Sequence, residues 1–200
     1  MLSEVTPVPD ATLPLEPFKA HLRLGTGFAE SGLQYGLLVG FLRAALAAIE
    51  KRTGKALLQR GFLWRLDRWG QTSQLSLPLA PVTEVTRIDV FDANGAQESL
   101  ELSDFWLEPD PQEPRLHRRS TCYPQLSSGA YAEIDFTAGM APTWSQLPSD
   151  LAQAVLMLAA HYYEYRHETA LGDGCMPFGV TSLIQRYRVV RLRLGAGAGQ

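Results

Sequence analysis

Several features that would identify a common class of enzyme or metal protein are missing from this sequence. Its two cysteines, Cys122 and Cys175, lie far apart and form no CxxC pair. Neither a disulfide framework nor a zinc site is therefore indicated, and reduced thiols are expected. Phosphate-binding loops of the GxxxxGK[ST] and GxGxxG types are absent, and so is a GxSxG nucleophile motif. These absences leave the chain without a recognisable catalytic motif.

The chain also has little net charge. Its 200 residues include 18 Lys and Arg and 21 Asp and Glu, a balance of −3. A general nucleic-acid binder normally carries a basic excess, so that class is not indicated. Residues 1–10, MLSEVTPVPD, show no basic region followed by an apolar one, and no secretory signal is expected. The length and the 46% hydrophobic content fit one globular domain, or one domain with an elaboration.

No apolar run is long enough to suggest a membrane span. The most apolar segment, residues 33–49 (LQYGLLVGFLRAALAAI), is shorter than the ~20 residues that a spanning helix needs, and Gln34 and Arg43 interrupt it. We interpret it as a core helix, buried by its own domain alone or partly by a neighbouring subunit. The second interpretation predicts contacts between copies of the chain at Leu37, Phe41, Ala44 and Ala48.

The clearest pattern is that of a helix over residues 147–168, LPSDLAQAVLMLAAHYYEYRHE. Apolar residues recur there at the spacing of one helical face. Pro148 and Asp150 suit a helix start, and the glycines at 172 and 174 predict an end near Thr169. A second long helix is expected over residues 29–52, with Gly54 as its left-handed cap, and a short one over residues 15–24.

Between these helices the apolar period changes to two residues, which is typical of strands. Asn94-Gly95 predicts a hairpin turn because glycine tolerates positive φ. The expected strands are 57–66, 74–77, 85–91, 97–102 and 130–137, with fragments in 105–119 that prolines interrupt. Helices, strands and helices in that order predict an α+β fold, a small helical bundle with an inserted antiparallel β-sheet. We expect one domain over 1–200, with helices at about 15–53 and 147–169, the β-region at about 56–138 and a C-terminal segment at about 176–200.

Candidate chemical groups do not assemble into a convincing site. His161 and His167, with glutamates beside them, are six residues apart and point in different directions from a helix, which disfavours a shared metal ion. Cys175 lies in a Gly-rich loop without an identifiable base. Carboxylate pairs such as Glu108 and Asp110 lie in a segment that is acidic throughout. We therefore expect no catalytic residue, no metal site and no cofactor.

Charge is distributed unevenly along the chain. Residues 84–113 contain nine acidic side chains and one basic one, residues 115–119 contain three arginines and a histidine, and residues 186–193 contain four arginines and no acid. Such runs often form only solvated faces. They also fit subunits that join head to tail, or docking on a partner of opposite charge.

The C-terminal stretch 181–194, TSLIQRYRVVRLRL, interleaves apolar residues with arginines. It fits a helix, and from Tyr187 onward it also fits an extended strand. It is either a last element of the core or a segment that a partner must cover. A single aromatic residue makes a poor stacking platform, so nucleic acid is a weak candidate for that partner.

Three stretches together resemble the head–tail connector proteins of tailed bacteriophages, also called adaptor or head completion proteins. The stretches are LPLAPVTEVTRIDVFDANG (77–95), FTAGMAPTWSQLPSDLAQAVLMLAAHYYEYRHE (136–168) and MPFGVTSLIQRYRVVRL (176–192). The longer members, found in prophages and phage-like gene transfer agents, are the most similar. Residues 96–130 have no counterpart in that pattern.

The resemblance implies a structural protein of a virion or gene transfer agent particle, assembled in the bacterial cytoplasm and placed at the head–tail junction. It implies a ring of about twelve copies between the portal and a tail stopper or tail protein, through which double-stranded DNA passes without specific binding. It implies no catalytic residue and no membrane. The portal-docking residues carried over are Phe178, Ile184, Tyr187, Arg188, Val190, Arg191 and Leu192.

Two other functions remain open at this point. One is a tail terminator or another tail-assembly protein, which would also form rings. The other is a small enzyme that uses Cys175.

Overall fold

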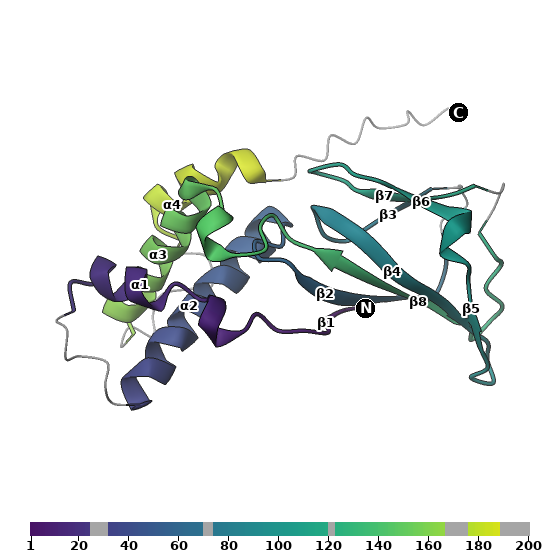
Figure 1. Ribbon diagram of the computed structural model, residues 1–200, viewed down its shortest axis with the longest axis horizontal. Coiled ribbons are helices and arrows are strands. Elements are labelled where there is room, and N and C mark those ends of the chain that lie inside the picture. Colours follow the sequence, from purple (N-terminus) through teal and green to yellow (C-terminus); the bar gives the residue numbers. More distant parts are fainter. Residues whose placement is uncertain (25–31, 70–73, 120–122, 167–175, 189–200) are drawn as a thin grey trace, which may run out of the picture.

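The computed structural model describes residues 1–24, 32–69, 74–119, 123–166 and 176–188. Helices gather at one end of an elongated molecule and strands at the other (Figure 1). The helices are α1 (Leu15–His21), α2 (Gly32–Thr53), α3 (Ser149–Glu164) and α4 (Phe178–Ile184). The strands are β1 (Leu2–Glu4), β2 (Arg60–Leu66), β3 (Gln74–Ser76), β4 (Val82–Phe91), β5 (Gln97–Ser99), β6 (Phe105–Glu108), β7 (Arg115–Arg118) and β8 (Tyr131–Ala138).

The strands form two antiparallel sheets. The larger has the order β1-β2-β8-β4-β5, with a three-residue strand at each edge, and the smaller has the order β3-β7-β6. Buried side chains of both sheets share one core, which includes Phe62 and Phe136 of the larger sheet and Leu116 of the smaller one. The alternation of buried and half-buried residues along β8 is that of a strand with one face on this core.

The helical end has a core of its own, in which α3 is central. α3 contacts α1, α2 and α4, and each helix contributes buried apolar side chains. Examples with no exposed surface are Phe18 of α1, Leu42 of α2, Leu151 of α3 and Val180 of α4. Ala154, Ala159 and Ala160 of α3 are buried, and α2 packs against this helix.

The two ends of the molecule are joined where the chain leaves α2 and where it leaves β8. The amide of Ala141 donates to the oxygen of Leu57 at 3.2 Å, and the amide of Gln59 donates to the oxygen of Ala141 at 2.9 Å. Gly139 lies at this crossing with φ +152°, and a Cβ there would be 2.3 Å from the Cα of Gln59. Only glycine fits, because the obstructing atoms are backbone.

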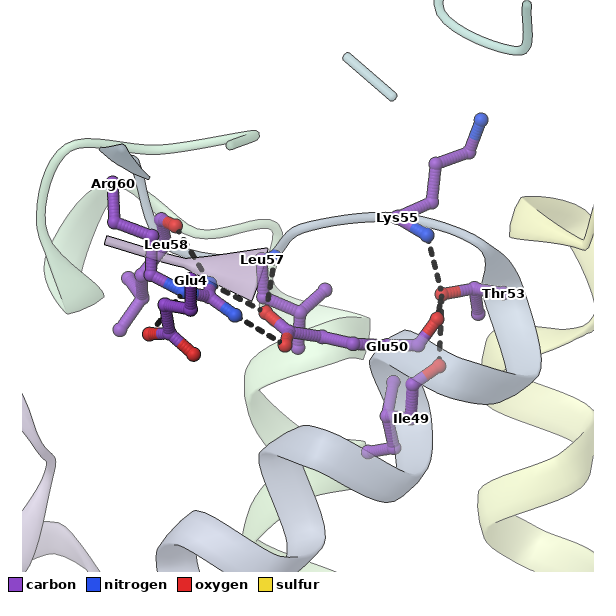
Figure 2. A network of polar contacts seen from close by, with 8 residues as sticks. All are labelled: Glu4, Ile49, Glu50, Thr53, Lys55, Leu57, Leu58 and Arg60. Carbon is purple, nitrogen blue, oxygen red and sulfur yellow. Dashed lines mark hydrogen bonds and ion pairs between the residues drawn. The ribbon is translucent and has the colours of Figure 1, made fainter. Parts of the chain in front are cut away.

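An ion-pair network fixes the same junction (Figure 2). The Arg60 guanidinium of β2 binds both carboxylate oxygens of Glu50 on α2, at 2.9 and 2.7 Å, and its Nε faces Glu4 of β1 at 2.7 Å. The side chains of Arg60 and Glu50 are only 10% and 14% exposed. Burial lowers the pKa of Arg60, but Glu50 and Glu4 more than offset this effect and the pKa is raised. Helix and sheet are therefore held by a mostly buried charge pair.

The structure confirms the predicted α+β fold, including the 147–168 helix, which forms α3, and the hairpin at Asn94-Gly95. Gly54 has φ +69°, as expected of a left-handed cap. Within the N-terminal fourteen residues, Leu2–Glu4 form an edge strand and Leu13 is buried. α3 ends at Glu164, earlier than the predicted Thr169, which lies outside the described residues.

Candidate assembly surfaces

One side of α2 is exposed and nearly free of charge. Leu37 is 45% exposed, and Ala44 is exposed as well. A Cβ built on Gly36 or Gly40 would meet nothing within 4 Å. The one charged residue of this helix before Glu50, Arg43, is held by the N-terminal segment, where it donates to the oxygen of Val8 at 2.7 Å and pairs with Asp10. A helix that shows an uncharged face of small and apolar residues to solvent fits close approach by another chain.

The four residues predicted to contact another copy do not all lie on this face. Leu37 and Ala44 are exposed on it, whereas Phe41 and Ala48 are half-buried and pack against the helical core. The Phe41 ring meets Tyr163 of α3 edge to face, with 6.1 Å between centroids. The face continues into an open groove between α2 and the sheet edge, lined by Leu2, Ala47, Glu50, Lys51, Gly54, Lys55, Ala56, Arg60, Phe62 and Leu79.

Within the described residues the C-terminal stretch forms α4 and a following 3₁₀ turn, Gln185–Tyr187. The strand that the sequence also fits from Tyr187 onward falls almost wholly on residues 189–194, outside the described residues. Of the predicted docking residues, Phe178 is 87% exposed at the start of α4, and Arg188 is exposed after the turn. Ile184 is different. It has no exposed surface because its side chain is part of the helical core, so it anchors α4 and is not available to a partner. Val190, Arg191 and Leu192 lie outside the described residues.

Tyr187 is half-buried and is held at the start of α3. Its hydroxyl donates to Asp150 Oδ1 at 2.8 Å, and the Arg186 guanidinium lies 2.8 Å from Asp150 Oδ2. Burial is the main cause of a raised pKa at Tyr187, with Arg186 opposing it and Asp150 supporting it, so the hydroxyl keeps its proton at neutral pH. The sequence indicated that Asp150 suits a helix start but not that it binds residues 36 and 37 positions away.

The opposite charges of residues 84–113 and 115–119 partly neutralise each other within the chain. β6 and β7 pair so that Glu108 lies opposite Arg115, and Glu108 contacts His117 Nε2 at 2.6 Å. Trp106 stacks on His117 with 4.1 Å between ring centroids. The pairing of β6 with β7 therefore explains part of the charge alternation along the sequence, and this alternation does not by itself indicate an external partner.

Chemical sites are not evident in the described part of the chain. Among those residues, no three His, Cys, Asp or Glu side chains are placed to hold a metal ion. His161 and Glu164 lie on α3, whereas His167, Glu168, Cys122 and Cys175 fall outside the described residues. In the same part of the chain, no helix combines the length and apolarity required to cross a bilayer.

The chain is similar to chains in solved structures of gene transfer agent (GTA) particles. It is 48% identical to one in the neck of an empty GTA particle computed with C6 symmetry, over 98% of this chain and 100% of that chain, with a TM-score of 0.87. A chain of the virion of a native GTA particle matches at 48% identity over 98% of both chains, with a TM-score of 0.83. A chain in the neck of a native GTA particle computed with C12 symmetry matches at 44% identity over 98% and 100%, with a TM-score of 0.81. No protein-family profile and no curated protein sequence matches the chain.

The fold and these similarities define a structural component of a virus-like particle, and not an enzyme. The chain belongs to the family of neck proteins of gene transfer agent particles, and its place is the head–tail junction of such a particle.

Proposed function

We propose that this protein is the ring-forming adaptor that joins the capsid portal of a gene transfer agent particle to its tail. The whole chain would act as one adaptor domain, with a portal-docking segment that begins near residue 176. The observation that carries the proposal is the similarity over 98% of the chain to a chain of a neck computed with C12 symmetry. The C12 symmetry of that neck supports a ring of twelve copies, and the C6 symmetry used for the empty particle is compatible with it. The protein would act by geometry without a chemical step.

A closed ring requires two different contact faces on each copy, because its interfaces are heterologous. The uncharged face of α2, with Leu37, Gly40 and Ala44, supplies a candidate for one of them. These three residues are uncharged, the neighbouring Arg43 is paired with Asp10, and the small residues permit close packing. Phe41 and Ala48 lie at the edge of this face, where they are half-buried and pack against the helical core.

The second part of the proposal concerns the chain beyond α4. Phe178, Tyr187 and Arg188, followed by Val190, Arg191 and Leu192, would bind the portal, while the opposite side of the ring receives the tail stopper or a tail protein. DNA would pass through the ring without specific binding. The slight acidic excess of the chain supports this, because DNA phosphates gain nothing from a negative wall.

The copy–copy contact is tested with Ala44→Glu on the α2 face and Gln153→Glu as a matched control on the exposed side of α3. Both positions are exposed, so both variants should keep the stability of the parent within about 0.5 kcal/mol. Each variant is supplied to producer cells that lack the gene, and the neck proteins of purified particles are quantified. Ala44→Glu should be missing from particles while Gln153→Glu is retained. Equal incorporation of the two variants would refute the role of this face.

Portal docking is tested with a chain that ends after Arg188. This boundary keeps Tyr187 bound to Asp150, so the body should stay folded. We expect the shortened protein to be absent from purified particles and to fail to bind capsids isolated from cells that lack the gene. Retention on particles would contradict the docking role. Binding to purified tail tubes in preference to such capsids would instead support a tail terminator.

A further inference from the structure

Asp150, in the first turn of α3, is the point at which the C-terminal segment is fixed to the body. Its Oδ1 accepts a hydrogen bond from the Leu151 amide at 3.0 Å and another from the Tyr187 hydroxyl at 2.8 Å. Its Oδ2 faces the Arg186 guanidinium at 2.8 Å. One carboxylate thus binds both of the last two residues of the 3₁₀ turn that follows α4. The side chain is 23% exposed, which is shielded enough for these contacts to persist.

Arg186 and Tyr187 also contact each other. Arg186 donates to the Tyr187 hydroxyl at 2.5 Å, and its guanidinium lies over the Tyr187 ring, 4.7 Å from the centroid. The Tyr187 side chain also packs against the helical core. Tyr187 is therefore fixed by an acceptor, a cation and an apolar surface.

The chain changes conformation immediately after Tyr187. Arg188 has extended dihedral angles, φ −68° and ψ 134°, and its amide donates to the oxygen of Gln185 at 3.3 Å. The direction in which a polypeptide leaves a folded body is set by its last fixed residues. Asp150 acts on those residues from a rigid helix, since Leu151 and Val155 of α3 are fully buried.

We propose that Asp150 is a positioning residue that aims the C-terminal docking segment at its partner. The inference rests on the proposed function, because it assumes that the segment after Arg188 is the part that docks. A segment that starts from a fixed base loses less conformational freedom when it binds than one that starts from a loose base. A held Tyr187 therefore increases affinity beyond any contact that it makes with the partner itself.

The aim of the segment is measured directly with spin labels. Labels at Arg188→Cys and Gln153→Cys, in a chain with Cys122→Ser and Cys175→Ser, report the separation between the segment and α3 by pulsed electron paramagnetic resonance. We expect one narrow distance distribution in this parent and a broad one after Asp150→Asn or Tyr187→Phe. Glu164→Gln, an exposed carboxylate at the far end of α3, is the matched control and should leave the distribution narrow.

Affinity is measured on capsids isolated from producer cells that lack the gene, with unlabelled variants. Asp150→Asn and Tyr187→Phe should weaken binding about tenfold, the loss expected when a charge-assisted hydrogen bond is removed. If Asp150→Asn fails to fold, Tyr187→Phe gives the same reading, because it removes the hydroxyl and leaves Asp150 paired with Arg186. A narrow distribution and full affinity in these variants would overturn the positioning role.

The outcome separates this inference from the proposed function. If the chain that ends after Arg188 still binds the capsids, the docking role fails, and the distance measurement alone then decides whether Asp150 fixes the segment. If that chain does not bind but Asp150→Asn binds like the parent, docking stands and the positioning role is refuted.

Discussion

Replacing Gly139 by alanine should break the connection between the two ends of the molecule. The added Cβ would lie 2.3 Å from the Cα of Gln59, 2.4 Å from its nitrogen and 2.6 Å from the carbonyl carbon of Leu58. These three atoms belong to backbone that is fixed by hydrogen bonds to Ala141, so a side-chain rotation cannot relieve the clash. The backbone at residue 139 would have to move away from the backbone of Leu58 and Gln59. The φ of +152° also disfavours any residue with a Cβ.

The cost can be bounded from these contacts. Overpacking a core usually costs 1–3 kcal/mol, and here two backbone hydrogen bonds at the crossing, worth about 1 kcal/mol each, are lost as well. We therefore expect Gly139→Ala to lower the free energy of unfolding by about 3–5 kcal/mol, a large part of the roughly 5–15 kcal/mol typical of a domain. Urea unfolding followed by circular dichroism measures this difference.

Gly61→Ala is the matched control, because Gly61 lies in β2 of the same sheet. A Cβ there would lie 3.6 Å from Thr6 Oγ1, an ordinary contact, so stability should change by less than about 1 kcal/mol. A Gly139→Ala protein as stable as Gly61→Ala would refute the reasoning. That result would mean that the backbone following β8 does not need to pass so close to the backbone of Leu58 and Gln59.

Three further effects follow from the described contacts. Arg60→Met should cost about 3 kcal/mol in urea unfolding because it strands the mostly buried Glu50 carboxylate, and adding Glu50→Gln should recover part of that loss. Burial raises the pKa of Tyr123 to about 12 from 10.0. The free energy of unfolding that Tyr123 contributes below pH 10.0 should therefore fall by about 2–3 kcal/mol as pH rises to 12. Tyr123→Phe should remove this loss. Backbone amides of Ala96 and Asn94 lower the pKa of Asp92 below 3.8. The contribution of Asp92 to the free energy of unfolding, present above pH 3.8, should therefore vanish as pH falls through the lowered pKa. Asp92→Ala should flatten that part of the curve of stability against pH.

Local patterns were the predictable part of this fold. The 3.6-residue period around Leu151 and Val155 predicted α3, and Asn94-Gly95 predicted a hairpin, because both signals depend on neighbours in the sequence. β1 was missed since a three-residue strand carries no periodic signal and pairs with residues about sixty positions away. The same long range explains why the ion pair of Arg60 with Glu4 could not be anticipated.

The assembly surfaces show the same division. The apolar character of α2 was visible in the sequence, but which side faces solvent depends on how α3 packs, so Phe41 and Ala48 proved half-buried while Leu37 and Ala44 are exposed. Ile184 was assigned to a partner through the resemblance to connector proteins, but its side chain packs in the chain's own core.

The three-residue strands at both margins of the large sheet limit how copies of this protein can associate. A long free margin would let sheets add to one another without end, whereas β1 and β5 offer too few free amides and carbonyls for a stable extra strand. Addition of a further strand to β1 or β5 is thereby disfavoured. In the proposed ring, copies would meet through their helices, and a helical contact with a fixed rotation can close on itself and keep the neck finite.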